Sequence, residues 1–376
     1  MVNHSFYVQN PETNEGSYLI DKILEQCNEA IAGGAAFAFM SSGGVNLLIR
    51  DSRFLSFLEN HDFHLIVGVD AITDDKAVDE VKKVMLTYKN LKVDFFITQN
   101  KRSIFHPKFV WFQKEKESIH IVGSGNLTSG GLRWNVEAYS ILTDTTSNES
   151  SLIEWKKFLE ENKNHIYKHD NEKVISALSH NTKLKQALLK LKKGDDKLNE
   201  IEKSSLSQLP IEEDLVPPYE LKNEILIAEI PRNGDRLQQV NFDKKNFINF
   251  FGASDNQGEN VYVYFFHITH QGLLQAPEVR PAVVVKSHNF RFELNAVKGM
   301  IYPKEGKPIG LYLKVASKSF LYMVYLPTDK DYPKLQKILN DKAGESKSSM
   351  RRIVFTAQDI LERIPKSPIW NKYEII

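Results

Sequence analysis

The sequence predicts an α/β domain followed by a small β-barrel domain. Segments with helical periodicity alternate with strand-like segments up to residue 193. Residues 194–218 then combine three prolines with many charged and few apolar residues, which is typical of a linker. From 219 to 376 the pattern changes to short apolar runs of strand character. We therefore expect domains at 1–193 and 219–376, joined by a linker at 194–218.

The composition is that of an ordinary globular protein. Of 376 residues, 41% are hydrophobic and 26% are charged, and the chain is long enough for two domains with cores of their own. The single cysteine, Cys27, excludes a disulfide framework and a cysteine-rich zinc site. No basic segment precedes an apolar one at the N-terminus, and no apolar run approaches the ~20 residues of a membrane span. We expect a cytoplasmic protein without a membrane partner.

The two halves of the chain differ in charge. Residues 1–218 carry 26 Lys and Arg against 31 Asp and Glu, a net charge of −5, and residues 219–376 carry 23 against 17, a net charge of +6. This distribution fits a C-terminal domain that supplies most of the affinity for nucleic acid. A chance imbalance is the alternative, because +6 is modest for a segment of this length.

The first domain is expected to be a sheet with helices on both faces, because its helices and strands alternate. Two further strands are expected on either side of a charged turn at 113–118, and together they form a hairpin. The expected helices are 18–31, 42–58, 74–88, 151–159 and 173–193, and the other expected strands are 35–40, 63–69, 91–97 and 137–142.

Four polar residues cluster along this hairpin. His106 and Lys108 are two apart on a strand and therefore point the same way. Ser124 and Asn126, also two apart, follow the second strand. A histidine that attacks or protonates, a lysine and an amide that hold phosphate oxygens, and a hydroxyl donor suit metal-free displacement at a phosphodiester. The cluster predicts a phosphate-sized site with no metal and no cofactor.

His106-Pro-Lys108 followed by Gly123-Ser-Gly-Asn126 resembles the HKD signature of the phospholipase D superfamily. Gln113 stands where the aspartate of that signature would fall, and the turn before Gly123 is longer than usual. The resemblance implies that Glu137 is the acidic residue that orients the catalytic histidine. Either fragment alone is common and usually structural; both together, in order and flanked by strands, favour a phosphodiesterase.

The chain also resembles single-motif, metal-independent restriction endonucleases of the BfiI and NgoFVII type. That resemblance implies a phospholipase D-like nuclease domain, a mixed sheet flanked by helices. It also implies a C-terminal B3-like pseudobarrel that grips the major groove of DNA between two arms. The expected strands of this second domain are 224–230, 261–266, 281–285, 290–294, 309–315, 320–326 and 353–355, with one or two helices.

Two polar segments are candidates for the arms, and a plain surface loop is the alternative for each. The first, 231–240, offers groups suited to base edges. The second, 346–352, concentrates cations and hydroxyls suited to phosphates. The candidate DNA-binding residues are Arg232, Asn233, Arg236, Gln238, Gln239, Lys347, Arg351 and Arg352.

These observations predict a sequence-specific restriction endonuclease for double-stranded DNA that acts through a phosphohistidine. Because only one HKD-like motif is present, and two imidazoles must flank the phosphorus, we expect a homodimer with one composite site. A phospholipid hydrolase is disfavoured by that single motif, and a decayed, non-catalytic DNA-binding protein by the intact His106, Lys108, Asn126 and Glu137. The sequence leaves open whether a methyltransferase or helicase subunit accompanies the chain.

Overall fold

The computed structural model divides the chain into two compact units, which are Met1–Pro11 with Gly16–Leu215 and Glu12–Glu15 with Val216–Ile376. The described residues are 2–12, 17–70, 72–99, 103–145, 152–192, 219–232, 237–255, 261–275, 278–284, 290–343 and 350–370. The predicted linker, 194–218, lies outside them. Within the described part of the chain, no helix is both long and apolar enough to cross a membrane.

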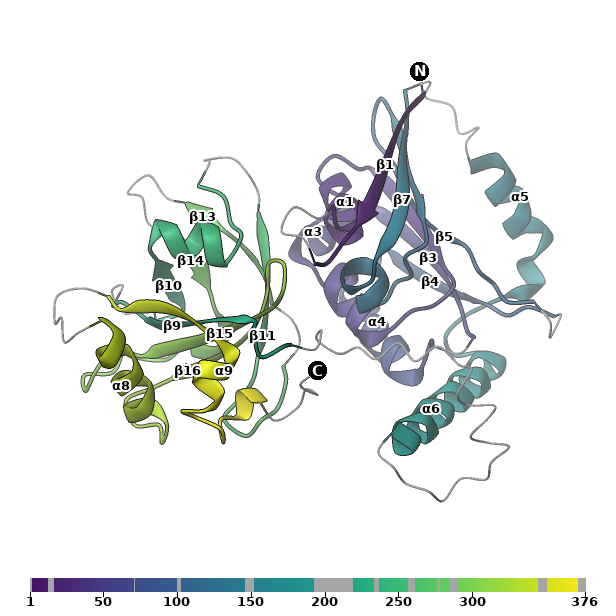
Figure 1. Ribbon diagram of the computed structural model, residues 1–376. Helices are drawn as coiled ribbons and strands as arrows, with labels where there is room; N and C mark the ends of the chain where they lie inside the picture. Colours follow the sequence, from purple (N-terminus) through teal and green to yellow (C-terminus); the bar gives the residue numbers. More distant parts are fainter. Residues whose placement is uncertain are drawn as a thin grey trace. The chain divides into compact units, whose positions relative to one another are not determined.

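Unit 1 is built on a mixed sheet, eight-stranded over its described residues (Figure 1). β2 and β3, and β3 and β4, pair in parallel, and the other neighbours pair antiparallel. In sheet order the strands are β1 (Val2–Gln9), β7 (Glu137–Asp144), β6 (Ser118–Gly123), β5 (Lys108–Gln113), β2 (Ala32–Phe37), β3 (Asp62–Gly68), β4 (Leu91–Phe96) and β8 (Ile166–Tyr167).

Helices cover both faces of this sheet, as the sequence predicted. On one face Phe57 of α3 packs against Phe112 of β5, with ring centroids 5.9 Å apart. On the other face Trp155 of α5 packs against Phe109 of the same strand, at 4.9 Å. The helices are α1 (Leu19–Gln26), α2 (Ser42–Gly44), α3 (Ser52–Asn60), α4 (Asp75–Thr87), α5 (Ile153–Glu161) and α6 (Glu172–Lys192).

Two expectations for unit 1 need correction. The helix expected over 42–58 is divided into α2, a π-helix at Val45–Ile49 and α3, because Asp51 caps a new helix by accepting a hydrogen bond from Arg53 N–H. Strand β1 was not expected at all. Its apolar residues Phe6 and Val8 are exposed while its polar Gln9 is buried, so the usual pattern of a half-buried strand is reversed.

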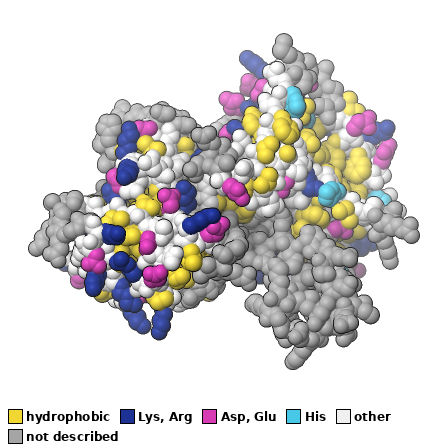
Figure 2. Space-filling model, in the orientation of Figure 1, with side chains coloured by type: hydrophobic (Ala, Val, Ile, Leu, Met, Phe, Trp, Pro, Cys, Tyr) yellow, Lys and Arg dark blue, Asp and Glu magenta, His cyan; other side chains and the backbone are white. Residues whose placement is uncertain are grey.

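Part of one sheet face is apolar and exposed, over β1, β7 and β6. Phe6 lies opposite Ser140, which lies opposite Val122, and these three therefore share a face. The exposed fractions are 64% for Phe6, 51% for Val8 and 47% for Val122. Figure 2 shows hydrophobic side chains gathered over β1 and β7. An exposed apolar surface of this kind is typical of an interaction site. We call it the β1–β7 face.

Unit 2 has two sheets around one aromatic core. Over the described residues, one sheet contains β12 (Glu278–Pro281), β11 (Tyr262–His267), β16 (Ser319–Tyr325), β15 (Ile309–Ala316), β9 (Glu224–Glu229) and β17 (Arg352–Thr356). The other contains β10 (Gln239–Phe242), β14 (Phe290–Glu293) and β13 (Val283–Val284). Phe251 lies at the centre of the core, with ring contacts to Phe242, Phe265, Phe292 and Phe320. Helices α8 (Tyr332–Ala343) and α9 (Ala357–Leu361) complete the unit.

The described strands do not form the closed barrel that the sequence predicted. β17 is an edge strand of the larger sheet and β10 an edge strand of the smaller one. The side chain of Arg352 connects these two edge strands, because its Nη2 donates to the backbone oxygen of Asn241 at 2.8 Å. The short strands of the smaller sheet, two to four residues long, limit how far backbone pairing can extend.

Gln9 ties three segments of unit 1 together from a fully buried position. Its amide nitrogen donates to the backbone oxygens of Gly131 and Asn135, at 3.3 and 2.9 Å, and its oxygen accepts from Leu19 N–H at 2.9 Å. We expect Gln9→Ala to lower the free energy of unfolding of unit 1 by about 3 kcal/mol, because three buried backbone groups lose a partner. Urea unfolding measures this change. Gln26→Ala, at a partly exposed residue of α1, is the matched control, and equal effects of the two would contradict the assignment.

Candidate active site

His106 and Lys108 meet at the start of β5. Lys108 is the first residue of that strand and lies opposite Phe37 of β2. Its Nζ lies 3.0 Å from both ring nitrogens of His106 and 3.3 Å from the backbone oxygen of His106. The imidazole also has an edge contact with Phe39, at a centroid distance of 6.0 Å. The two side chains therefore point the same way, as their spacing led us to expect.

The protonation equilibria of both residues are shifted toward neutral forms. Partial burial, and then the positive charge of Lys108, lower the pKa of His106 below its ordinary value. Burial also lowers the pKa of Lys108, while the negative charge of Glu137 opposes that change. A neutral imidazole has a lone pair with which to attack phosphorus. This arrangement favours His106 as a nucleophile at neutral pH.

Ser124 and Glu137 form a second pair beside the first. The Ser124 hydroxyl donates to Glu137 and accepts from Ala138 N–H at 3.1 Å. The backbone N–H of Ser124 donates to the Ala138 oxygen at 3.0 Å, which extends the pairing of β6 with β7 by one residue. Asn135 Nδ2 donates to the other oxygen of Glu137 at 3.3 Å. The Glu137 carboxylate is therefore held in place and is close enough to Lys108 to affect its pKa.

Asn126 is fixed against the segment that carries Phe39. Its side-chain oxygen accepts from Phe39 N–H at 3.3 Å. Because this oxygen is engaged, the NH₂ group is the part of the amide that can donate to a phosphate oxygen. Phe39 thus connects Asn126 to His106, whose ring it contacts. These contacts link His106, Lys108 and Asn126, and the charge of Glu137, which Ser124 holds, acts on Lys108.

The structure shows the contacts of two further residues of the signature region, Glu137 and Gln113. In the described residues Glu137 makes hydrogen bonds with Ser124 and Asn135 and none with His106, so the structure does not show it orienting the histidine. Gln113, which replaces the aspartate of the HKD signature, donates to the backbone oxygens of Lys114 and Glu117, at 2.7 and 3.2 Å. It therefore stabilises the hairpin turn at the end of β5 opposite His106.

Sequence reasoning missed a residue that holds the backbone beside His106. The half-buried carboxylate of Asp70 accepts a hydrogen bond from the backbone N–H of Phe105. Burial raises the pKa of Asp70, and that hydrogen bond opposes the rise. Asp70 follows directly on the expected strand 63–69. Its place at the carboxyl end of a strand was the signal that could have revealed it.

The described residues contain no group of three or more His, Cys, Asp and Glu placed to hold a metal ion. Two pairs of histidines have the spacing of metal ligands, His61 with His64 and His267 with His270, but His64 and His270 have other partners. His64 Nε2 lies 2.8 Å from Asp94 Oδ2 in an ion cluster with Lys92 and Lys168. His270 Nε2 lies 3.0 Å from the backbone oxygen of Val324.

The first candidate DNA-contacting arm is partly described. Asn233 and Arg236 lie outside the described residues. Arg232 is exposed and Gln238 half-buried. Gln239 belongs to β10 and is buried, with its amide nitrogen 3.1 Å from Glu293 Oε1. It is therefore part of the sheet and does not extend from an arm.

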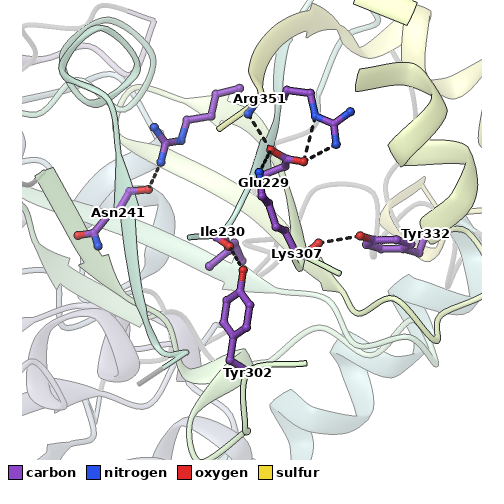
Figure 3. Close-up of polar contacts among 8 residues, drawn as sticks. Glu229, Ile230, Asn241, Tyr302, Lys307, Tyr332 and Arg351 are labelled. Carbon is purple, nitrogen blue, oxygen red and sulfur yellow. Dashed lines mark hydrogen bonds and ion pairs between the residues drawn. The ribbon is translucent and has the colours of Figure 1, made fainter. Parts of the chain in front are cut away.

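In the second candidate arm, Lys347 lies outside the described residues, and the side chains of the two arginines are each 12% exposed. Figure 3 shows Arg351 directed at Glu229. Arg351 donates to Glu229 through its backbone N–H at 2.9 Å, through Nε at 3.0 Å and through Nη2 at 2.5 Å. Lys307 Nζ adds a contact to the same carboxylate at 3.2 Å. Arg352 bonds Asn241 and lies 3.7 Å from Asp243 Oδ2. Both arginines therefore have a structural role.

Residues 48–159 match the family model described as cardiolipin synthase, PLD-like domain. The match includes all five candidate site residues. Over these residues unit 1 is similar to phospholipase D-like domains.

Solved structures that match part of the chain include NucT, Nuc and a tyrosyl-DNA phosphodiesterase. NucT from Helicobacter pylori is 14% identical, with a TM-score of 0.34 over 44% of this chain and 99% of that one. Nuc from Salmonella typhimurium, a phospholipase D family member, is 10% identical, with a TM-score of 0.33 over 44% and 97%. Yeast tyrosyl-DNA phosphodiesterase is 14% identical, with a TM-score of 0.31 over 44% and 42%. No curated protein matches the chain.

Replacing Lys108 should raise the pKa of His106. We expect Lys108→Met to have this effect because it removes a positive charge that disfavours the imidazolium, although burial still lowers the pKa. An NMR titration of the His106 ring protons measures it. Lys114→Met removes the same charge at the hairpin turn, roughly 20 Å along the strand, and should leave the titration unchanged. An unshifted His106 in Lys108→Met would contradict the proposed coupling.

Replacing Arg351 should destabilise unit 2. Glu229 is 3% exposed, and Arg351→Ala would remove the guanidinium and leave it with the backbone N–H of residue 351 and Lys307, at a cost of about 3 kcal/mol in the free energy of unfolding. Urea unfolding at pH 7 measures this loss. Arg363→Ala, which breaks a half-exposed pair with Asp341, is the matched control and should cost under about 0.5 kcal/mol.

The same loss should depend on pH. Although burial acts to raise the pKa of Glu229, hydrogen bonds from Arg351 hold it below its ordinary value. A lowered folded-state pKa stabilises the protein above the unfolded-state pKa, and this contribution disappears as pH falls through the folded-state value. The difference between wild type and Arg351→Ala should therefore shrink in acid. A difference that grows in acid would mean that Glu229 is not the partner that matters.

Proposed function

We propose that this chain is a sequence-specific, metal-independent DNA endonuclease of restriction type. The observation that carries the proposal is the contact of His106 with Lys108, next to the Ser124–Glu137 pair, within a phospholipase D-like domain. These groups supply a nucleophile, a cation and hydrogen-bond donors around one phosphate. Nothing in this set requires a metal to generate the nucleophile.

The proposed reaction has two displacements. Neutral His106 attacks phosphorus, the bond to the 3′ oxygen breaks, and a second imidazole gives that oxygen a proton. Water then attacks the phosphohistidine, the second imidazole takes the proton of water, and the bond between nitrogen and phosphorus breaks. Lys108 and Asn126 stabilise charge on the non-bridging oxygens. Glu137 holds Ser124 and helps to keep Lys108 protonated.

A second copy of the chain supplies the second imidazole in this proposal. The phosphorus needs an imidazole on each side, and the chain has one His-x-Lys followed by Gly-Ser-x-Asn. The β1–β7 face offers apolar surface for such a copy, and Ala138 of that sheet region binds Ser124 of the site. A twofold axis close to this face places the two His106 residues on either side of one phosphate.

Unit 2 supplies recognition of double-stranded DNA in this proposal. Its net positive charge favours the phosphate backbone, and Arg232 is exposed at the first candidate arm. Arg351 and Arg352 support the arms by fixing β17 to β9 and β10, as their pairing with Glu229 and Asn241 suggests. By resemblance to the BfiI and NgoFVII type, this unit is the B3-like domain.

Cleavage should persist in EDTA. The site has a cation, hydrogen-bond donors and one carboxylate, Glu137, whereas two-metal nucleases gather several carboxylates. A sequenced plasmid is digested with and without EDTA, and the ends are mapped by run-off sequencing. Discrete fragments in both samples support the proposal, and His106→Ala should give none. Loss of cleavage in EDTA that magnesium restores would overturn the mechanism, and a smear would mean a non-specific nuclease.

A heterodimer of wild-type and His106→Ala chains should be almost inactive. One composite site needs both histidines, so the loss of one removes either the nucleophile or the acid. The two chains carry different affinity tags, the mixed species is isolated, and its turnover is compared with that of the wild-type homodimer. Activity at half the wild-type rate or above would show that each chain has a complete site.

A further inference from the structure

A pocket of about 500 Å³ lies beside His106, on the side of α5. His106 and Pro107 form part of its lining. Phe96, Phe105 and Phe158 form the aromatic part, with the rings of Phe96 and Phe105 stacked at 4.6 Å and those of Phe96 and Phe158 at 5.6 Å. Its volume falls in the range of about 300–1,000 Å³ that is usual for small-ligand sites. A single nucleotide unit fits such a space and a double helix does not.

Two polar side chains in the lining have unused hydrogen-bonding capacity. Asn162 Nδ2 donates to the Phe158 backbone oxygen at 2.8 Å, which leaves the amide oxygen as an acceptor. His165 is anchored by its backbone, since its N–H donates to Asn162 and its oxygen accepts from Ile97. Within the described residues the His165 imidazole makes no hydrogen bond, and its ring contacts Phe96 at 6.0 Å. The Asn162 oxygen can accept a hydrogen bond, and the His165 ring can donate or accept one. Such groups can bind the edge of a heterocyclic base.

The charges around the pocket favour a neutral group inside it and a phosphate beside it. The described lining contains no Lys, Arg, Asp or Glu. The cation of the site, Lys108, lies next to His106, which is part of the lining, but is not itself in the lining. A phosphate is therefore favoured at His106 and Lys108, and an uncharged aromatic group inside the pocket.

We propose that this pocket holds an unpaired nucleobase of the strand that is cut, next to the phosphate that His106 attacks. The inference rests on the proposed function and specifies its substrate, a strand with one nucleotide out of the helical stack at the cut. Turning a base out of the stack costs a few kcal/mol, and stacking against aromatic side chains with hydrogen bonds to the base edge offsets that cost. Asn162 and His165 read the base, and the aromatic part of the lining packs against it.

Binding of a single-stranded oligonucleotide tests the pocket without turnover. The full-length His106→Ala protein is titrated with a single-stranded oligonucleotide that carries 2-aminopurine at the position 5′ to the scissile linkage. We expect quenching of the 2-aminopurine fluorescence on binding. Further Asn162→Ala or His165→Ala replacement should each weaken binding about tenfold. Asn164→Ala, an exposed residue two positions from Asn162, is the matched control and should leave binding unchanged.

An abasic oligonucleotide links the effect to the base. The abasic oligonucleotide should bind the His106→Ala protein about tenfold more weakly than the complete one. Adding His165→Ala should not weaken the binding of the abasic oligonucleotide further, because the contact between His165 and the base is already absent. Equal affinity for the abasic and the complete strand, or unchanged affinity in Asn162→Ala and His165→Ala, would overturn the pocket assignment.

Plasmid cleavage by otherwise wild-type chains carrying these variants distinguishes the two proposals. Unchanged cleavage with no base-dependent binding rejects the pocket alone, whereas base-dependent binding by a chain that never cleaves DNA rejects the nuclease alone.

Discussion

Three hydrogen bonds between the segment Phe39–Ser41 and the segment Asn126–Leu127 hold the candidate site together. Leu127 N–H donates to the Phe39 oxygen at 3.1 Å, Ser41 N–H donates to the Leu127 oxygen at 3.0 Å, and Phe39 N–H donates to the Asn126 side chain at 3.3 Å. Close backbone approach makes this possible. A Cβ at Gly44 would lie 2.0 Å from the Leu127 oxygen, and one at Gly131 would lie 2.3 Å from Asn126 N. The loop with Asn126 and the strand end beside His106 are thereby fixed against each other.

The electrostatics of the site follow from this placement. Lys108 lies between an imidazole that it helps to keep neutral and a carboxylate that helps to keep it charged. The carboxylate is in turn held by Ser124 and Asn135, and Asn135 is bound through its backbone by buried Gln9. Polar groups fixed in advance need little rearrangement when charge develops on a phosphate. The β1 strand thus supports chemistry to which it contributes no reacting group.

In unit 2, arginine residues that the sequence suggested for phosphate binding have a structural role in the fold. From the sequence, Arg351 and Arg352 look like phosphate-binding residues next to lysine and serine. In the fold, Arg351 neutralises the buried carboxylate of Glu229, and Arg352 reaches across to β10 where the backbones of the two sheets do not pair. Buried pairs of this kind are costly to break from one side. The contacts of Arg352 with Asn241 and Asp243 fix the two sheets of unit 2 to each other.

The sequence by itself determined the order of most helices and strands, the hairpin, and the residue types of the site, because hydrophobic periodicity and short-range spacing are local properties. It did not reveal β1, whose outer residues are apolar and whose inner Gln9 is polar. Nor did it reveal the hydrogen bond between Ser124 and Glu137, which depends on the register of β6 against β7 that brings Ser124 beside Ala138. Tertiary structure alone decided the pocket beside His106. Its walls come from β4, the segment before β5 and α5, and only folding brings such distant segments together.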